Sequence, residues 1–371
     1  MEQLTRRENF LRAARRQSFQ WIPLDFGLNP GALLTFKQNA GAQAKVDEYF
    51  NFDGKWLSGR GTMNRPLPDY RKLYFADGSL PENAVIDEYG MATVTDPATD
   101  DQQHYYPMRN FSSAQDVDAF PWPSAAEEAS RYEGLTEQVS QAQAAGFCVH
   151  VSGAQGWFQG NCELMGYDNF LMHLGEDSPV ARRLMERWSE RQVWRMEQCA
   201  KSGADIIQSG DDVATQIGTM ISPAMFREQF FPQMRAAIQA AKRINPQVLI
   251  RHHCCGNCSA VLEDYIAAGV DILDPCQPEC MDLFELKRRY GKSVSFHGGI
   301  GVQSVLPHGT PQEVRDAVRR TVDVMADGGG YLCSSSHSIG RDVPWANIVA
   351  MVEALREYGA PPPVGQKYKV G

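Results

Sequence analysis

Two overlapping His-x-Cys pairs stand in the run His252-His253-Cys254-Cys255, at the end of an apolar stretch that is typical of a strand. Side chains two positions apart in an extended chain point to the same face, so His252 pairs with Cys254 and His253 pairs with Cys255. Imidazole nitrogen and thiolate sulfur are ligands that Zn²⁺ prefers in proteins. Either pair could therefore supply two ligands of a zinc site.

The third ligand of such a site has to come from another part of the chain. Cys333 and His337, just beyond the last predicted strand, are the candidates, because strand ends converge across a narrow barrel. Three protein ligands and one open position are typical of catalytic zinc. Five of the nine cysteines lie between Cys254 and Cys280, which in a reducing compartment indicates metal or redox chemistry before disulfides. The alternative is a packed His and Cys cluster that holds no ion.

Other polar residues follow further predicted strands, where a barrel carries its active site. Asp211 and Asp212 are predicted as catalytic carboxylates, acting as general acid or base, substrate anchor or additional metal ligand, with helix capping as the alternative. His297 is also predicted as a catalytic residue, with a core histidine bonded to the backbone as the alternative. Gln277 and Trp157 are the predicted substrate contacts, and aromatic packing is the alternative for Trp157.

Short β-rich segments alternate with longer stretches of helical periodicity, which favours parallel βαβ units. Eight such segments predict a closed (β/α)8 TIM barrel rather than an open doubly wound sheet, because no Gly-rich phosphate turn follows the first segment. The predicted strands are 21–26, 55–59, 147–152, 204–209, 247–252, 270–274, 293–297 and 330–333. Helical periodicity is clearest at 5–16, 179–202, 223–244, 258–268, 311–326 and 344–358.

Residues 60–123 interrupt this alternation, since they are rich in Pro, Asp, Tyr and Gly and contain a hairpin-like stretch at 85–94. We interpret them as an excursion inserted after the second strand, where it caps one face of the barrel. The remaining pattern predicts one domain over residues 1–360, followed by a C-terminal tail at 361–371 that begins with three prolines.

The composition is that of a globular protein, since 43% of the 371 residues are hydrophobic and 22% are charged. The net charge of −9 and the lack of a Lys/Arg run argue against a nucleic-acid partner. No stretch reaches 18 consecutive apolar residues, which predicts no membrane span. The charged start of the chain lacks an apolar signal core, which favours a cytoplasmic location. The oligomeric state stays open, with a homodimer as one option.

These motifs, in this order, resemble the uroporphyrinogen decarboxylase superfamily, and the resemblance covers nearly the whole chain. The fold that it implies is a (β/α)8 barrel, in agreement with the strand count. The matching stretches are densest in the C-terminal half and comprise 7–12, 22–25, 210–212, 221–223, 253–256, 269–275, 295–300, 329–331 and 336–339.

One branch of this superfamily consists of zinc-dependent methyltransferases, which move a methyl group between a corrinoid and a thiol or another acceptor. Their ligands follow a His-x-Cys-Gly pattern plus a late cysteine, so the resemblance implies His253 and Cys255 as ligands and places His337 at the position of that cysteine. It also implies Zn²⁺ and a methylcobamide corrinoid, either as a co-substrate or on a partner protein that docks at the barrel mouth. A histidine in place of a thiolate leaves one fewer negative charge at the metal, which favours a small methoxy donor over a thiol.

The other branch decarboxylates uroporphyrinogen without a cofactor and holds the substrate carboxylates with an arginine-bearing loop after the first strand. This chain has no arginine in the corresponding stretch 26–32, and a substrate with many carboxylates needs a basic cleft to offset their desolvation. A zinc-dependent methyltransferase is therefore the predicted function. A cofactor-free decarboxylase of another substrate is the alternative enzyme class, and a non-catalytic binding protein on a retained barrel is the third.

Overall fold

The computed structural model describes residues 3–58, 63–76, 78–97, 99 and 101–360. Its central sheet consists of seven parallel strands in the order β1-β5-β6-β9-β10-β11-β12. Several of these strands are buried along their whole length, as expected when helices cover one face and other strands the opposite face. The bounds are β1 (Gly54–Leu57), β5 (Cys148–Gln155), β6 (Ile206–Gly210), β9 (Leu249–His253), β10 (Ile272–Cys276), β11 (Ser295–Ile300) and β12 (Tyr331–Ser335).

The segment 22–28 takes the eighth position, between β12 and β1. Leu24 forms a single parallel bridge with Cys333 of β12, and its carbonyl oxygen accepts from the backbone N–H of Asp53 at 3.4 Å. The prediction of a regular strand at 21–26 is wrong, because Leu24 forms only an isolated bridge. Pro23 has no N–H to donate to a ladder. The architecture is an α/β fold of the TIM-barrel type.

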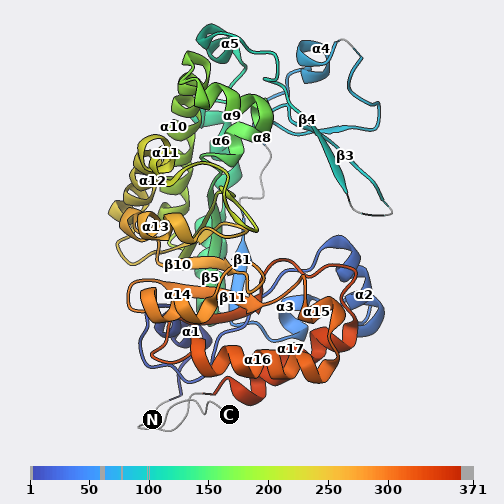
Figure 1. The fold of residues 1–371 in the computed structure, drawn as a ribbon, viewed down its shortest axis with the longest axis vertical. Coiled ribbons are helices and arrows are strands. Elements are labelled where there is room, and N and C mark those ends of the chain that lie inside the picture. Colours follow the sequence, from blue (N-terminus) through green and yellow to red (C-terminus); the bar gives the residue numbers. More distant parts are fainter. Residues whose placement is uncertain (1–2, 59–62, 77, 98, 100, 361–371) are drawn as a thin grey trace.

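Helices connect the parallel strands and surround them (Figure 1). Local signals define their starts: Ser178 caps α10 and Thr310 forms a capping box with Glu313 at α16. The helix predicted at 223–244 is interrupted by a π-helical turn, Phe226–Phe230. The bounds are α1 (Arg6–Ala14), α2 (Pro30–Ala40), α3 (Val46–Tyr49), α7 (Leu135–Ala144), α8 (Gln159–Met165), α9 (Tyr167–Gly175), α10 (Pro179–Lys201), α11 (Pro223–Met225), α12 (Phe231–Ile244), α13 (Leu262–Ala268), α14 (Leu283–Tyr290), α15 (Val305–His308), α16 (Pro311–Met325) and α17 (Trp345–Tyr358).

Helix α1 closes the end of the barrel at which the strands begin. Phe10 of α1 is fully buried and packs, with two alanines of the same helix, in an apolar cluster. The other members of the cluster come from the starts of the strands and are Cys148, Ile206, Leu249, Ile272 and Leu332. This apolar plug leaves the carboxyl ends of the strands as the open end, where barrels carry their active sites.

The chain between β1 and β5 adds a small antiparallel sheet in the order β2-β3-β4. Figure 1 shows β3, β4 and the helix α4 standing out from the helices around the parallel strands. The bounds are β2 (Val85–Ile86), β3 (Ala92–Thr95), β4 (Gln102–Tyr105), α4 (Tyr70–Tyr74), α5 (Ala114–Ala119) and α6 (Ala125–Ala129). The predicted excursion at 60–123 falls on this region, although parts of it and the predicted tail 361–371 lie outside the described residues. No helix in the described ranges is long and apolar enough to cross a membrane.

Candidate metal centre

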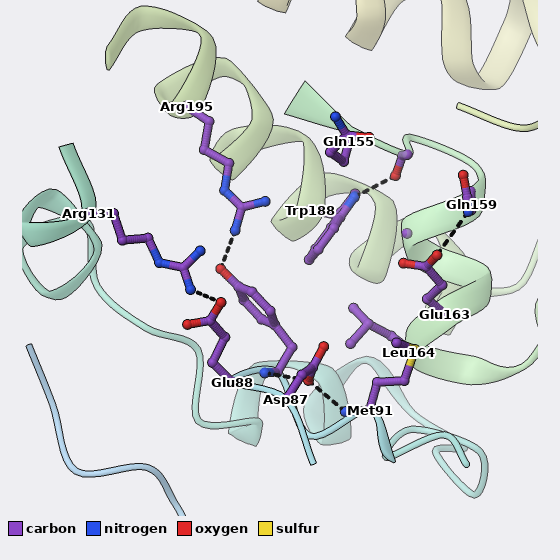
Figure 2. A pocket seen from close by; sticks show the side chains of 13 residues that line it. Asp87, Glu88, Met91, Arg131, Gln155, Gln159, Glu163, Leu164, Trp188 and Arg195 are labelled. Atoms are coloured by element: carbon purple, nitrogen blue, oxygen red, sulfur yellow. Dashed lines mark hydrogen bonds and ion pairs between the residues drawn. The ribbon is translucent and has the colours of Figure 1, made fainter. Parts of the chain in front are cut away.

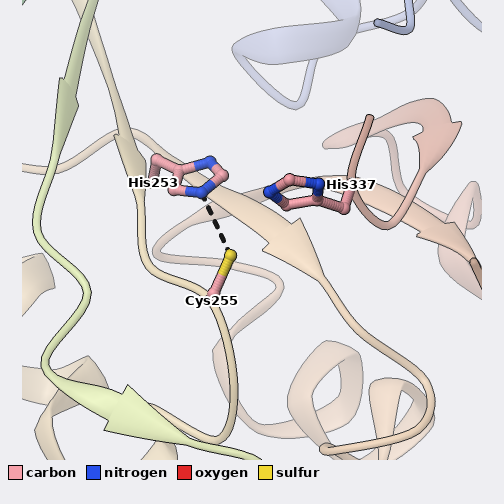
Figure 3. Close-up of side chains that lie close together, drawn as sticks. All are labelled: His253, Cys255 and His337. Carbon is pink, nitrogen blue, oxygen red and sulfur yellow. Dashed lines mark hydrogen bonds between the residues drawn. The ribbon is translucent and has the colours of Figure 1, made fainter. Parts of the chain in front are cut away.

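His253, Cys255 and His337 converge at the open end of the barrel (Figure 3). His253 is the last residue of β9, Cys255 lies in the loop that follows, and His337 comes from the loop after β12. One ligand atom from each residue lies within 4.8 Å of the others, and Nε2 of His253 is 3.2 Å from Sγ of Cys255. Two strands separate β9 from β12 in the sheet, so the curvature of the barrel brings the three side chains together.

The donor set and its spacing fit Zn²⁺. Ligand atoms of a tetrahedral zinc site lie about 3.3–3.8 Å apart, which is close to the separation of His253 and Cys255. Burial raises the pKa of the Cys255 thiol, but the two imidazoles outweigh burial and lower it overall. The hydrogen bond to Cys255 in turn raises the pKa of His337, against burial. A thiol that ionises readily beside two imidazoles is the chemistry that a metal ligand set requires.

Asp274 of β10 holds the other ring nitrogen of His253. Its Oδ2 lies 2.9 Å from Nδ1 of His253, and because a carboxylate only accepts, Nδ1 carries a proton and Nε2 is the ring nitrogen that faces Cys255. Burial lowers the pKa of His253, but the bonds to Asp274 and Cys255 more than compensate, and the pKa lies well above its usual value. A carboxylate behind a ligating histidine is a common second partner in metal sites.

The predicted catalytic carboxylates Asp211 and Asp212 face different elements. Oδ1 of Asp212 accepts from the backbone N–H of Cys255 at 2.7 Å and lies 3.9 Å from Nε2 of His253. Asp211 is buried, and its carboxylate accepts from the backbone N–H groups of Phe158 and Gln159 at the start of α8. Burial raises the pKa of Asp211 to about 7, despite these hydrogen bonds. We call His253, Cys255 and His337 the metal cluster, because they could hold a metal ion. The structure places Asp212 beside this cluster and Asp211 at a helix start.

Gln277, a predicted substrate contact, lies against the loop that carries Cys255. Its Oε1 accepts from the backbone N–H of Gly256. Gly256 has φ of +82°, and a Cβ there would lie 2.4 Å from the carbonyl oxygen of Thr215. Thr215 belongs to a short hairpin of β7 (Ala214–Thr215) and β8 (Gly218–Thr219). Glycine is thus required for the loop to pass this hairpin.

A buried ion network lies next to the metal cluster, within the barrel. Its members are Asp25, Arg251, Asp274 and His297. Arg251 of β9 pairs with Asp25 at 3.1 Å and with Asp274 at 3.0 Å. The two ring nitrogens of His297 bond to the same two carboxylates. Burial raises the pKa of both carboxyls, but the neighbouring cations hold it below the usual range. Burial and Arg251 lower the pKa of His297, and the two carboxylates outweigh them, so that two cations balance two anions.

His297 therefore uses both ring nitrogens inside this network, and its catalytic role stays a prediction. Asp25, Arg251 and Asp274 were not singled out by their place after a strand, because they lie within the barrel. The signal that could have found Arg251 is the strand period of two, since it shares a face with His253 in β9.

Other residues of suitable chemistry point into the core. Cys333 is fully buried and bonds to the hydroxyl of Tyr331. His252 and Cys254, the second His-x-Cys pair, are also fully buried. Trp157 is buried with its ring 6.3 Å from that of His252, and its role as a substrate contact stays a prediction.

A cavity of about 320 Å³ lies between the metal cluster and the ion network. Residues of both groups line it, and Trp56, Gln208 and Ser334 are among the other residues of its wall. Its volume is in the range of small-molecule sites. His253 and His337 thus border a space that a small substrate fits.

A second cavity, of about 340 Å³, lies between the β2–β3 connection and the helices α8 and α10 (Figure 2). Its polar groups bond to one another: Arg131 pairs with Glu88, Arg195 bonds to a tyrosine hydroxyl, and Glu163 accepts from Gln159 at 3.0 Å. Burial raises the pKa of Glu163 to about 6. We take the cavity beside His253 and His337 as the candidate functional site, because these residues belong to the group that could hold a metal ion.

Comparisons with known proteins place the chain in a family of enzymes. The model of the family "Uroporphyrinogen decarboxylase (URO-D)" matches residues 106–358. A methylated-thiol–coenzyme M methyltransferase of Methanosarcina mazei is 28% identical over 163 residues, which are 44% of this chain and 40% of the relative. A uroporphyrinogen decarboxylase of a Hydrogenobaculum species is 26% identical over 174 residues, which are 47% of each chain. The chain thus spans less than half the length of these curated relatives.

Among solved structures, a methyltransferase from Methanosarcina mazei superposes with a TM-score of 0.69. The match covers 96% of this chain and 100% of the other, at 14% sequence identity. At this identity the likeness shows the shared fold.

Proposed function

The chain belongs to the uroporphyrinogen decarboxylase family, and from this premise we propose that it is a zinc-dependent methyltransferase, which moves a methyl group between a small donor and a corrinoid or thiol acceptor. The observation that carries the proposal is the cluster of His253, Cys255 and His337 beside a substrate-sized cavity. The named relatives include a methyltransferase and decarboxylases, and decarboxylation without a cofactor has no use for such a ligand set.

His253, Cys255 and His337 would hold Zn²⁺ with a fourth position open to the cavity. Bound there, zinc would supply Lewis-acid polarisation of the atom that carries or receives the methyl group. Two neutral imidazoles and one thiolate leave less negative charge at the metal than two thiolates would. A methoxy group or similar oxygen-bound methyl is therefore the proposed donor.

The other residues of the site position these ligands and the substrate. Asp274 keeps the proton on Nδ1 of His253, and the cations Arg251 and His297 keep Asp274 ionised and in place. Asp212 fixes the backbone of Cys255. The plug formed by α1 excludes water from the opposite end of the barrel. Holding donor and acceptor in one orientation is the main contribution that such a site makes to the rate.

The proposed co-substrate is a methylcobamide corrinoid, free or on a partner protein. It would approach from the carboxyl ends of the strands, because α1 closes the other end. The metal cluster lies at this open end, with His337 exposed. Methyl donor, acceptor and partner are all part of the proposal.

A decarboxylase of another substrate is the alternative, because relatives of that name match the chain. The pairing of Arg251, the arginine in the cavity wall, argues against a decarboxylase whose substrate carries several carboxylates. Arg251 is paired with Asp25 and Asp274, so an incoming carboxylate would meet two buried anions.

The proposal is tested by elemental analysis of the purified protein and by methyl transfer. We expect about one zinc per chain and methylcobalamin formation from cob(I)alamin and a methoxy donor. His253→Ala and Cys255→Ser should lose both zinc and transfer. Cys280→Ser, at a half-buried cysteine outside the cluster, is the matched control and should keep both.

Full zinc content in both His253→Ala and Cys255→Ser would refute the metal site. Conversion of uroporphyrinogen at an enzymatic rate, without added metal, would contradict the proposed methyltransferase function.

A further inference from the structure

Trp56 of β1 is a large apolar side chain that stays exposed inside the barrel. Its exposed fraction is 41%, and it lines the cavity that His253 and His337 also border. The indole points inward, because its N–H donates to Asp25 at 3.2 Å and the guanidinium of Arg251 lies 5.0 Å from the centre of its ring. Both partners are buried within the barrel. The exposed part of the indole therefore borders the cavity and not the helices around the strands.

The indole is also fixed in place. Besides the contacts with Asp25 and Arg251, the ring of His150 lies 4.9 Å from that of Trp56. His150 is the neighbour of Trp56 on β5 and is fully buried. A contact surface that is ordered before the ligand arrives loses little conformational entropy on binding. Trp56 thus offers a pre-organised aromatic surface to a molecule in the cavity.

A second aromatic side chain, Phe26, belongs to the same cavity wall. It lies in the segment 22–28 beside β1, and it is largely buried. The wall thus combines aromatic side chains with two histidines of the metal cluster. The cavity volume of about 320 Å³ exceeds the roughly 150 Å³ that is enough to hold benzene in a protein interior. An aromatic ring that carries a methoxy group can be accommodated in this space.

Covering an exposed apolar surface is favourable, and two aromatic rings in contact gain about two- to tenfold in binding beyond the area that they bury. We infer that Trp56 is a specificity-determining residue, which packs against an aromatic ring of the methyl donor. The substrate class is then an aryl methyl ether. This inference rests on the proposed function, because it takes the cavity as the site of the methyl donor.

The test compares methoxybenzene with methoxycyclohexane, which carry the same methoxy group on an aromatic and on a saturated ring. Calorimetry measures binding of each ether to the natural chain, to the aliphatic variants Trp56→Leu and Trp56→Met, and to Trp56→Phe. In the aliphatic variants, methoxybenzene should weaken about two- to tenfold more than methoxycyclohexane does. Trp56→Phe keeps an aromatic ring and should retain the preference of the natural chain.

Two controls separate the ring contact from other effects of the substitutions. All three variants of Trp56 lose the N–H bond to Asp25, so a difference between Trp56→Phe and the aliphatic variants reports the aromatic ring itself. Trp194→Leu, on the outer helix α10 against Tyr132, is the matched control. It should bind both ethers as the natural chain does.

A second arm follows transfer of the methyl group from the ether oxygen of methoxybenzene to cob(I)alamin. The O–CH₃ bond breaks, the Co–CH₃ bond of methylcob(III)alamin forms, and the phenolate takes up one proton to give phenol. A preference for methoxybenzene that the aliphatic variants lose, without methylcobalamin from either ether, means that the proposed function fails while Trp56 still selects for the ring.

Three results would overturn the inference: no binding of methoxybenzene by the natural chain, equal weakening of both ethers in the aliphatic variants, or the same loss of preference in Trp56→Phe as in those variants.

Discussion

Asp274 connects the metal cluster to the ion network, because its two oxygens face different partners. Oδ2 accepts from His253 and Gln208, and Oδ1 accepts from Arg251 and His297. Burial raises the pKa of Asp274, but the charges of Arg251 and His297 and the hydrogen bond from His253 outweigh burial and keep this pKa well below the usual range. In the proposed zinc site, the retained negative charge would make the imidazole of His253 a stronger metal ligand.

Replacing Asp274 by asparagine keeps the shape and removes this charge. Asp274→Asn should therefore weaken zinc binding by about 10–100-fold, measured by competition with a chromophoric chelator. Asp264→Asn, at a carboxylate paired with Arg227 on another element, should leave the affinity unchanged. Equal affinities of Asp274→Asn and the natural chain would contradict the role assigned to this carboxylate.

We propose His337, rather than Cys333, as the third zinc ligand. His337→Ala should lose most of the bound zinc, because its ring faces Cys255 and His253 (Figure 3). Cys333→Ala should keep the zinc, since this thiol is buried against Tyr331. Elemental analysis of the two variants decides between them, and the opposite pattern would identify Cys333 as the ligand.

At the scale of elements, the segment 22–28 takes the place of a strand and depends on Asp53, which directly precedes β1. The carboxylate of Asp53 accepts from the indole N–H of Trp21 at 2.7 Å and from the backbone N–H of Leu24 at 3.2 Å. Burial raises the pKa of Asp53 to about 6, although these bonds oppose it. Because the segment carries Asp25 into the ion network, Asp53 supports the site at a distance.

The raised pKa of Asp53 makes its contribution to stability depend on pH. In the unfolded chain an aspartate titrates near about pH 3.9, so between about pH 4 and 6 the folded state binds more protons than the unfolded state. The contribution of Asp53 to the free energy of unfolding therefore falls as pH rises through this window and is constant above it. Asp53→Asn removes the titration, so its stability relative to the natural chain should increase by about 2 kcal/mol from pH 4 to pH 7.

Urea unfolding of both proteins across this range measures that difference. Asp316→Asn, at an exposed position of α16, is the control and should run parallel to the natural chain. Parallel curves for Asp53→Asn as well would show that Asp53 does not titrate in this window.

At the scale of the whole molecule, the proposed zinc would link distant parts of one barrel domain, which we propose spans residues 1–360. His253 ends β9 and Cys255 lies in the loop after it, whereas His337 follows β12. A ligand that binds only the folded state stabilises it by about 2.7 kcal/mol when its free concentration is 100 times its dissociation constant. The unfolded chain lacks this arrangement, so zinc should stabilise the whole fold.

Thermal unfolding with and without a chelator tests this linkage. The natural chain should show a higher Tm with zinc than without, and Cys255→Ser should show the same Tm in both conditions. An unchanged Tm of the natural chain at full zinc occupancy would rule out a metal that bridges the barrel mouth.

The sequence by itself determined the features that depend on a few neighbouring residues. The periods of two and 3.6 predicted most parallel strands and long helices, and the spacing of His253 and Cys255 predicted that these side chains share one face. The same reasoning was wrong at 21–26, where Pro23 interrupts the pairing. It also predicted one helix over 223–244, which a π-helical turn interrupts.

Only the tertiary structure decided which strand ends and side chains meet. His337 and Cys333 are four residues apart, and their pattern does not tell which one faces the mouth of the barrel. Asp211 and Asp212 are adjacent, yet Asp211 accepts a hydrogen bond from the start of α8 and Asp212 accepts one from the backbone of Cys255. The periodicity of a strand selects the face of a side chain, but its partner depends on the register and curvature of neighbouring strands, which long-range packing sets.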